Sequence, residues 1–265
     1  MISGRPTSPV EVPRAVKGWL AEREAEVVWR NELGGLTFHV EDGAASSFLK
    51  WQPHGTSIDL SSEVPRLRWA SHYVTVPKVL DFGQNDEGSW LVTRPIDAEN
   101  AVSERWKRAP RTAAVAIGEG LRAMHDALPV SSCPFEWRAI DRVDTVRQRV
   151  SDEAQHEHAV SRRVASVSES TALRELSDVP TEDLVVCHGD ACAPNTLLGS
   201  NGRWRAHVDL GRLGVGDRWA DLAIAAWSTV WNYGEGFEST VYEAYGVAPD
   251  APKIRYYRLL WDLES

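Results

Sequence analysis

Hydrophobic and polar residues alternate along the first third of the chain in the pattern of β-strands. Residues 36–41 and 46–51 show this alternation, and Asp42-Gly43 between them favours a hairpin turn. Two further strands are predicted at 76–82 and 89–93, joined by the turn-rich residues 83–88. The first third is therefore predicted to form a β-sheet.

A short helix is expected between these two pairs of strands. Ser61 and Ser62 precede it, and it runs to about Ser71. It contains Pro65, which a helix tolerates in its first turn, because the N–H that proline lacks has no helical partner there. We therefore expect the helix to begin only shortly before Pro65.

After Arg94 the pattern becomes helical. Apolar residues recur at steps of four, three and four along residues 111–128 and mark one face of an amphipathic helix that ends before Pro129. These apolar residues are Ile117, Leu121, Met124 and Leu128.

The second part of the chain is predicted to contain several more elements. Asp217 is the expected N-cap of one helix, and Asn201-Gly202 the turn of a hairpin. The predicted helices cover 141–175, 217–230 and 253–263, and the predicted strands cover 184–187, 196–198 and 204–210. The expected fold class is α+β, with a small β-rich N-terminal lobe joined near residues 94–100 to a larger helical C-terminal lobe.

Composition limits the classes of protein that this chain can be. Its 265 residues are 43% hydrophobic and 25% charged, which excludes a disordered or fibrous protein. No apolar run approaches the ~18 residues that span a bilayer, and the first residues lack the apolar centre of a signal peptide. The odd number of cysteines (Cys133, Cys187 and Cys192) suits reduced thiols. We expect a soluble, cytoplasmic protein.

The charge balance bears on partners. Asp and Glu number 38 against 29 Lys and Arg, a net charge of −9, which argues against a nucleic-acid-binding protein with a basic face. An acidic chain suits a cationic partner, although acidity also serves solubility alone. No membrane or obligate protein partner is implied.

The most informative motif is His188-Gly189-Asp190, followed by Asn195 five residues after the aspartate and by Asp209 after the next hairpin. Kinase catalytic loops combine a base Asp, an Asn five residues later and a second metal-binding Asp. Hard magnesium prefers such oxygen ligands together with phosphates. Asp190 alone could cap a turn, but the three spacings together favour catalysis.

This stretch resembles the aminoglycoside phosphotransferases, the antibiotic kinases. The matching motifs are H-G-D-x-x-x-x-N, D-x-G-R at 209–212 and the stretches 213–223, 120–135 and 253–263. The ending at 253–263 and the D-x-G-R stretch look most like the 3′-phosphotransferases, the kanamycin kinases, and streptomycin 3″-phosphotransferases share much of this core. The resemblance implies a two-lobed, protein-kinase-like fold, with a nucleotide-binding lobe at 1–96 and a catalytic and substrate-binding lobe at 97–265.

The resemblance also implies roles for individual residues of the second lobe. Asp190 is expected to be the base or the group that orients the acceptor hydroxyl, and Asn195 and Asp209 to bind Mg²⁺. His188 is expected to hold the loop. Arg212 either lies near the phosphates or the substrate, or is a surface cation.

In the first lobe, the resemblance implies that Lys50 contacts the α- and β-phosphates of ATP with Glu63 as its partner. The default for Lys50 is a solvated strand lysine. Gly34, Gly35 and Thr37 belong to the expected loop over the phosphates, for which a plain hairpin is the alternative.

The expected adenine-binding hinge covers 93–96, with Arg94 and Ile96 as candidates. Pro95 has no N–H to donate, so either Ile96 donates or the register differs.

The acceptor side rests on Asp262, which matches an acidic position near the end of the kanamycin kinases; an exposed charge at a helix end is the alternative. The sequence departs from the family at Ala193, where an acidic residue is frequent, and at Glu264-Ser265, where an aromatic residue is frequent. Asp152, Glu153 and Glu157 could add acidic groups, or form a solvated helix face.

Two tryptophans, Trp227 and Trp231, are four residues apart and are expected to pack in the second lobe, with stacking against a sugar as the alternative. The expected reaction transfers the γ-phosphoryl group of ATP to a hydroxyl, the 3′ one, of a cationic aminoglycoside and so confers antibiotic resistance. The alternatives are a streptomycin 3″-phosphotransferase, a kinase of another small metabolite and a non-catalytic pseudokinase that binds nucleotide.

Overall fold

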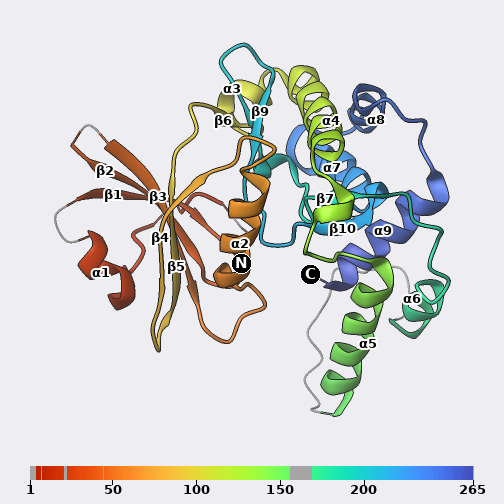
Figure 1. Cartoon of the computed structure of the whole chain (residues 1–265), viewed down its shortest axis with the longest axis horizontal. Helices are drawn as coiled ribbons and strands as arrows, with labels where there is room; N and C mark the ends of the chain where they lie inside the picture. The colour runs from red at the N-terminus through yellow and green to blue at the C-terminus, as the bar shows by residue number, and fades with distance from the viewer. Residues whose placement is uncertain (1–3, 7, 21–22, 44, 156–168, 265) are drawn as a thin grey trace. The chain divides into compact units, whose positions relative to one another are not determined.

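The computed structural model describes all residues except 1–3, 7, 21–22, 44, 156–168 and 265 (Figure 1). The chain divides into two compact units, Met1–Asp97 and Ala98–Ser265. Each unit is described by itself. Of the acidic residues predicted at 152–157, Glu157 lies outside the described residues, as do the side chains of Asp152 and Glu153.

The first unit is built on a five-stranded antiparallel sheet with strand order β1-β2-β3-β5-β4. Its elements are α1 (Arg14–Leu20), β1 (Glu24–Arg30), β2 (Leu36–Asp42), β3 (Ala45–Pro53), α2 (Leu60–Ala70), β4 (Lys78–Gln84) and β5 (Gly88–Arg94). The four predicted strands and the Asp42-Gly43 hairpin are confirmed, since Asp42 pairs with Ala45 across the turn. Helix α1 and strand β1 were not predicted.

One face of this sheet carries the core of the first unit. Alternate residues of β2 are buried, and Leu36, Phe38 and Val40 pack with Leu49 of β3 and Val16 of α1. Strand β1 lacks this alternation because it is an edge strand whose side chains are partly or fully exposed. Its hydrophobic pattern was for that reason too weak to predict it.

The position of Pro65 corrects the sequence prediction. Helix α2 begins at Leu60, capped by Asp59, whose side chain accepts the N–H of Ser61 at 2.9 Å, so Pro65 is the sixth residue and lies beyond the first turn. A proline inside a helix costs about 3 kcal/mol. Burial of Leu60 and Leu67 on one side of the helix offsets part of that cost.

The second unit combines helices with short strand pairs. Its helices are α3 (Glu104–Lys107), α4 (Pro110–Ala127), α5 (Ala139–Gln155), α6 (Glu169–Glu175), α7 (Arg218–Tyr233), α8 (Glu238–Tyr245) and α9 (Ala251–Glu264), with 3₁₀ turns η1 (Val130–Ser132) and η2 (Ala193–Asn195). Its strands are β6 (Glu99–Asn100), β7 (Leu184–Cys187), β8 (Thr196–Leu198), β9 (Trp204–His207) and β10 (Gly214–Asp217). Helix α8 and strand β10 were not predicted.

The core of the second unit forms around α4 and α7. The four apolar residues predicted on one face of α4 are at most 2% exposed, which confirms that amphipathic helix. Helix α4 packs on α8, and α7 packs on α9 (Figure 1). Among the residues that the structure describes, no helix is both long and apolar enough to cross a membrane.

Candidate active site

The predicted catalytic loop joins strand β7 to strand β8. Strand β7 pairs with β10, and β8 pairs with β9 across the predicted Asn201-Gly202 turn, where the N–H of Gly202 donates to Gly199 at 2.9 Å. These two strand pairs place the His188-Gly189-Asp190 segment next to the segment that contains Asp209.

His188 holds the loop through both of its ring nitrogens. Its Nδ1 accepts the backbone N–H of Asp190 at 3.2 Å, and its Nε2 lies 2.9 Å from the carbonyl oxygen of Val208. This pattern places a proton on Nε2, and both ring nitrogens are engaged. The side chain is fully buried, which suits the predicted structural role.

Gly189 allows the loop to approach the D-x-G-R motif closely. It has φ +85°, and a Cβ there would lie 2.4 Å from the carbonyl oxygen of Arg212. A larger residue would therefore be strained and would push the two motifs apart.

Asp190 and Asn195 are joined by hydrogen bonds. The Asn195 amide nitrogen donates to the backbone oxygen of Asp190 at 2.9 Å and to its Oδ2 at 3.1 Å. Asp190 is only half-buried, so its carboxylate can still meet a substrate. The predicted five-residue spacing thus brings both side chains to one place.

Asp209 lies two residues after the end of β9, and Asn195 immediately precedes its partner strand β8. The N–H of Val208 donates to the Asn195 carbonyl at 3.0 Å, which continues the β8–β9 pairing toward Asp209. Asp209 has φ +63° and is the one non-glycine residue with positive φ among those that the structure describes. Aspartate tolerates this conformation at some cost, and such strain clusters at functional sites.

The donor set formed by Asn195 and Asp209 fits a magnesium ion. The amide nitrogen of Asn195 is engaged with Asp190, which orients its oxygen as the atom left for a metal. One carboxylate and one amide oxygen are hard ligands, and magnesium is commonly held by so few protein groups together with phosphates.

Sequence reasoning missed the buried support of the loop, Asp221 of α7. Its Oδ2 accepts the N–H of His188 at 2.6 Å, and its Oδ1 accepts the N–H of Gly189 at 3.0 Å. His125 of α4 lies with Nε2 3.0 Å from Asp221 Oδ2 and with Nδ1 2.8 Å from the hydroxyl of Tyr245. An acidic residue amid the apolar residues of α7 was the signal in the sequence, because a buried carboxylate requires partners.

The pKa of Asp221 is lowered despite complete burial. Burial alone raises the pKa, but the hydrogen bond with His125, the charges of His125 and His188, and the backbone N–H of His188 outweigh it. Asp221 is therefore a buried carboxylate anion that holds the start of the loop.

A second support of the loop comes from Ser228 of α7. Its hydroxyl accepts the N–H of Ala193 at 2.9 Å and also receives the amide of Asn232 at 3.2 Å. Ser228 is fully buried. Helix α7 therefore holds the catalytic loop at both ends.

In the first unit, Lys50 and Glu63 form the predicted pair. Lys50 Nζ lies 2.9 Å and 3.0 Å from the two carboxylate oxygens of Glu63. The Glu63 side chain is 5% exposed and that of Lys50 20%, so Lys50 is not a solvated strand lysine. Thr37 of β2 pairs with Lys50 of β3 and belongs to the same patch of sheet.

Asn31 closes the turn that contains Gly34 and Gly35, between β1 and β2. Asn31 Oδ1 accepts the N–H of Gly35 at 2.7 Å, and its amide donates to Gln52 at 2.9 Å. Gly34 has φ +85°, and a Cβ on Gly35 would lie 2.0 Å from Gln52 Oε1. Gly34 thus suits the left-handed conformation of the turn between β1 and β2, and a Cβ on Gly35 would displace the side chains of Gln52 and Asn31. The contact of both glycines with phosphates stays a prediction.

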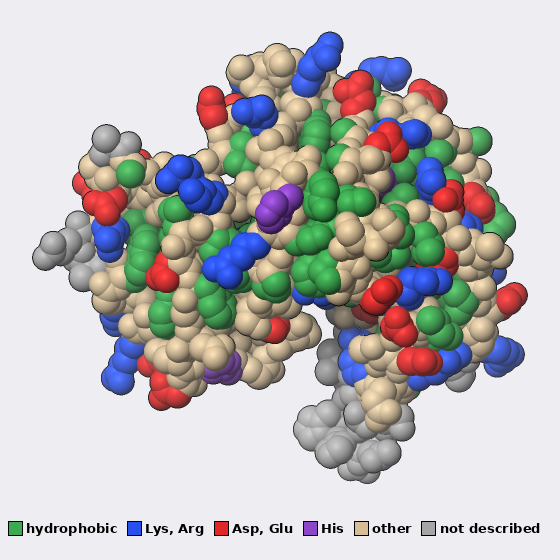
Figure 2. Space-filling view, in the orientation of Figure 1, with side chains coloured by type: hydrophobic (Ala, Val, Ile, Leu, Met, Phe, Trp, Pro, Cys, Tyr) green, Lys and Arg blue, Asp and Glu red, His purple; other side chains and the backbone are tan. Residues whose placement is uncertain are grey.

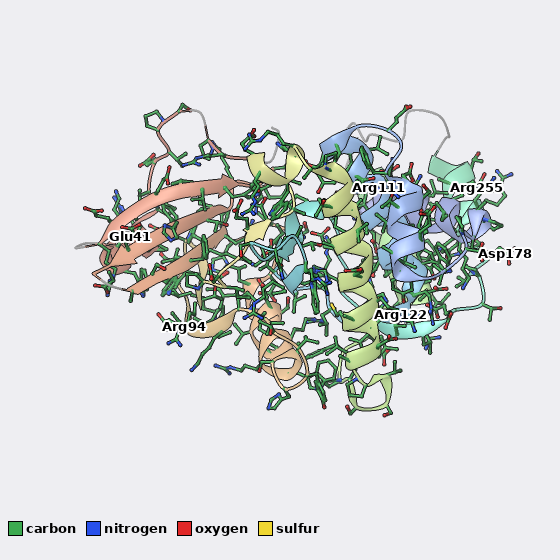
Figure 3. The ribbon with its side chains drawn as sticks, turned by 90° about the horizontal axis from the view of Figure 1, so that it is seen from above. Glu41, Arg94, Arg111, Arg122, Asp178 and Arg255 are labelled. Atoms are coloured by element: carbon green, nitrogen blue, oxygen red, sulfur yellow. The ribbon has the colours of Figure 1, made fainter. Side chains whose placement is uncertain are left out.

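Of the two candidates for the adenine-binding hinge, Arg94 ends β5 and Ile96 follows it. Arg94 is the last residue of β5, pairs with Lys78 and is exposed (Figure 3). Ile96 lies two residues beyond the strand and is half-buried. Their contact with adenine stays a prediction.

Arg212 is one of the two residues predicted on the acceptor side. Its guanidinium lies 5.8 Å from the ring centroid of Trp137, and that of Arg142 lies 4.6 Å from the same centroid. Arg142 Nε and Nη2 donate to the two carboxylate oxygens of Glu264 at 2.8 Å and 2.7 Å. Glu264 is thus anchored where relatives were expected to carry an aromatic residue. Asp262 lies half-buried in the last turn of α9, and its substrate role stays a prediction.

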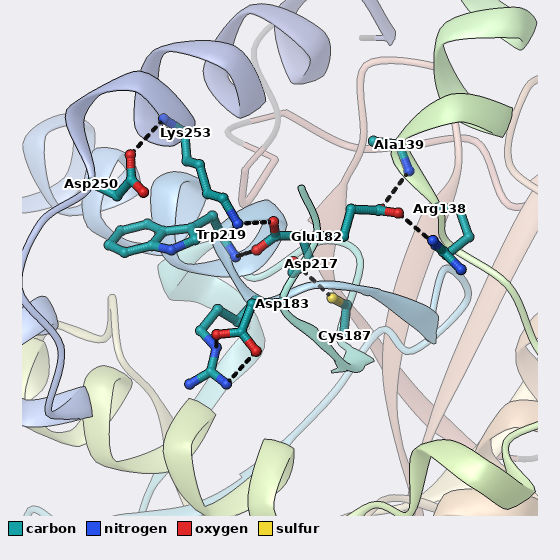
Figure 4. Close-up of polar contacts among 10 residues, drawn as sticks. Arg138, Ala139, Glu182, Asp183, Cys187, Asp217, Trp219, Asp250 and Lys253 are labelled. Carbon is teal, nitrogen blue, oxygen red and sulfur yellow. Dashed lines mark hydrogen bonds and ion pairs between the residues drawn. The ribbon is translucent and has the colours of Figure 1, made fainter. Parts of the chain in front are cut away.

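The predicted N-cap Asp217 is confirmed, and it also ties α7 to α9 (Figure 4). Its Oδ1 accepts the N–H of Trp219 at 2.9 Å, and its Oδ2 lies 2.5 Å from Lys253 Nζ. The Lys253 backbone in turn donates to Asp250 at 3.1 Å. The buried Asp217 carboxylate therefore fixes the helix that supports the loop against the helix that carries Asp262.

Acidic and basic side chains are interspersed over the face that Figure 2 draws. The acidic side chains of that face do not form one continuous patch.

Comparison with known proteins places this site among phosphotransferases. The model of the phosphotransferase enzyme family matches residues 30–259. An aminoglycoside 3′-phosphotransferase of Streptomyces fradiae is 36% identical over 220 residues, covering 78% of this chain and 81% of that protein. Streptomycin 3″-kinase of Streptomyces griseus is 35% identical over 253 residues, covering 90% of this chain and 89% of that protein.

Solved structures agree. A crystal structure of a type VIII aminoglycoside 3′-phosphotransferase has a TM-score of 0.79 at 29% identity, covering 94% of this chain and 97% of that one. A 3″-phosphotransferase from Streptomyces rimosus with ADP and streptomycin has a TM-score of 0.74 at 25% identity, covering 97% and 100%. These structures confirm the predicted α+β, protein-kinase-like fold class.

Proposed function

The chain belongs to the phosphotransferase enzyme family, and on that premise we propose that it transfers the γ-phosphoryl group of ATP to a hydroxyl of an aminoglycoside. The reaction would inactivate the antibiotic and confer resistance. The observation that carries the proposal is the hydrogen-bonded pair Asp190–Asn195, built next to the strained Asp209.

Asp190 would align the acceptor. Its half-buried carboxylate accepts a hydrogen bond from Asn195 Nδ2 and can accept another from a substrate hydroxyl. In a loose phosphoryl-transfer transition state, positioning and charge matter more than early proton removal. Asp190 would hold the hydroxyl in line and receive its proton.

Asn195 and Asp209 would hold Mg²⁺ through one amide oxygen and one carboxylate. When bound, magnesium supplies positive charge to phosphate oxygens. The chain's own contribution is to orient these two ligands through Asp190 and the Val208 backbone.

The first unit would bind the nucleotide. Glu63 holds the Lys50 ammonium group with both of its oxygens, and Lys50 would contact a phosphate oxygen of the bound nucleotide. Gly34, Gly35, Thr37, Arg94 and Ile96 remain the proposed further nucleotide contacts, within a nucleotide-binding lobe at 1–96.

The acceptor is proposed to be a cationic aminoglycoside phosphorylated at its 3′ hydroxyl, with Asp262 and Arg212 on the acceptor side of the catalytic lobe at 97–265. Phosphorylation of streptomycin at its 3″ hydroxyl is the second candidate, because the streptomycin kinase matches 90% of the chain. We place the activity in the cytoplasm, where ATP is supplied.

A direct assay tests this function. The purified protein is incubated with ATP, Mg²⁺ and either kanamycin or streptomycin, and the phosphorylated position is determined by NMR. We expect one phosphorylated product. If neither compound is phosphorylated, the proposed function is wrong.

A matched pair of variants distinguishes an active phosphotransferase from a non-catalytic pseudokinase. Asp209→Ala removes the one charged metal ligand and should abolish turnover at ordinary magnesium concentrations. Asp178→Ala removes an exposed carboxylate, labelled in Figure 3, and should leave turnover unchanged. Near-wild-type turnover of Asp209→Ala would contradict the metal assignment.

A further inference from the structure

Three tryptophans from two helices form one aromatic cluster in the second unit. Trp227 and Trp231 of α7 have ring centroids 4.8 Å apart. Trp261 of α9 lies 6.2 Å from the first and 5.5 Å from the second, with interplanar angles of 72° and 31°. We call Trp227, Trp231 and Trp261 the tryptophan platform.

The platform is not core packing alone: Trp227 is half-buried and packs in the second unit as expected, whereas Trp231 departs from that expectation. Trp231 is 47% exposed, although Ser228 and Thr229 on the preceding turn of α7 are buried. An isolated exposed indole needs no explanation. Here the exposed ring is the outer member of a stack, and the two rings behind it hold it in place.

The helix that carries two residues of the platform is hydrogen-bonded to the catalytic loop. Ser228, which accepts the N–H of Ala193, lies between Trp227 and Trp231 in the sequence. Residues three apart on a helix are neighbours on its surface, about 5–6 Å between Cβ atoms, so Trp231 lies beside Ser228. Ala193 follows Asp190 by three residues. Helix α7 therefore carries both the residue that supports the loop and, one turn further on, the exposed ring.

The platform already binds one cation through a ring. The Arg258 guanidinium lies 5.3 Å from the ring centroid of Trp227 and is held there by Glu238 and by the carbonyl of Ala223 at 3.2 Å. This arginine covers the Trp227 end of the platform. The exposed face belongs to Trp231, at the other end of the pair.

We propose that the exposed ring of Trp231, backed by Trp227 and Trp261, is a subsite that binds a protonated amino-sugar ring of the acceptor. Such a ring presents an apolar C–H face and an ammonium group, and an indole attracts both. The proposal rests on the proposed function and specifies how the acceptor is recognised. Trp231 is accordingly a specificity residue rather than a catalytic one.

Kinetics with kanamycin and streptomycin test the subsite. Trp231→Ala should raise the KM of the phosphorylated aminoglycoside about three- to thirtyfold, as loss of a cation–π contact does, with the KM for ATP unchanged. Trp231→Phe should recover part of the loss because a phenyl ring still stacks. The control is Trp69→Phe, a half-buried helical tryptophan 5.1 Å from Tyr73 in the first unit, which should change neither constant.

A binding measurement gives a readout besides turnover. Protein labelled with 5-fluorotryptophan is titrated with the same aminoglycoside, and the Trp231 resonance is assigned by its absence in Trp231→Phe. We expect the Trp231 resonance to shift with the acceptor concentration while the Trp69 resonance does not move.

The outcomes separate the two proposals. If the wild type phosphorylates an aminoglycoside but Trp231→Ala keeps its KM and the Trp231 resonance is unmoved, the platform proposal is overturned and the function stands. If the wild type neither phosphorylates nor binds kanamycin or streptomycin, the proposed function fails, and the subsite fails with it.

Discussion

The carboxylate of Asp221 accepts the backbone N–H of His188 at 2.6 Å across 33 residues of sequence. Together with the bond from Gly189, this places a fully buried anion directly beneath the predicted catalytic loop. The loop conformation therefore depends on a residue that need not touch any substrate.

Replacing Asp221 with Asn should loosen the loop. One of the two accepting oxygens becomes a donor facing an N–H, and leaving a buried donor unsatisfied costs about 1–3 kcal/mol. We expect the free energy of unfolding in urea to fall by that amount and turnover to fall with it. The control Asp183→Asn weakens an ion pair with Arg218 in which the Asp183 side chain is 56% exposed, and it should cost less than about 1 kcal/mol. If both variants lose the same free energy of unfolding, Asp221 does not support the loop in the way described.

Replacing Asp190 with Asn should preserve the fold and nucleotide binding but slow phosphoryl transfer. The asparagine oxygen can still accept from Asn195, whereas it cannot take the hydroxyl proton. General-base groups contribute about 10²–10⁴-fold in rate. Single-turnover kinetics paired with ATP titration measure both effects. A variant within a few-fold of the wild-type rate would remove Asp190 from the mechanism.

Lys50→Ala should raise the KM for ATP and leave the KM for the acceptor nearly unchanged. It also breaks the ion pair of the buried Glu63 carboxylate with Lys50, and removing one partner of a buried pair destabilises proteins by about 3–5 kcal/mol. The double variant Lys50→Met, Glu63→Gln removes both charges and should keep most of the stability while still losing ATP affinity. An effect confined to the acceptor would refute the nucleotide role.

Burial, and then the charge of His188, lowers the pKa of His207 to about 3. The unfolded imidazole takes up a proton near pH 6.5 while the folded one does not, so this contribution to stability is fully present above that pH and is lost as pH falls toward 3. The slope is about 1.4 kcal/mol per pH unit. Urea unfolding of His207→Phe between pH 7 and pH 4 should lack this slope; an unchanged slope would mean that His207 does not titrate in this way.

Acceptor binding should weaken as salt rises, because exposed charges are screened over about 8 Å at physiological ionic strength. Asp262→Asn should weaken aminoglycoside binding in calorimetric titrations and leave ATP affinity unchanged. Asp178→Asn, at an exposed site, serves as the control. A salt-independent affinity would count against a cationic acceptor.

Several features of this structure could be predicted from the sequence alone because they depend on interactions between residues close together in the chain. The Asp42-Gly43 and Asn201-Gly202 turns, the Asp217 cap and the apolar face of α4 each depend on residues within a few positions of one another, and the structure confirms them. The spacing of Asp190 and Asn195 is also local, and their hydrogen bond follows from one 3₁₀ turn. The catalytic role of the pair stays a prediction.

Only tertiary packing decided the contacts between residues far apart in the chain. The support from Asp221, the Arg142–Glu264 pair and the Trp261 side of the platform each join segments separated by more than 25 residues. Packing also placed Pro65 inside α2. Such contacts form because burial removes charged and aromatic groups from water and obliges them to find partners, and sequence patterns do not specify which partners packing brings within reach.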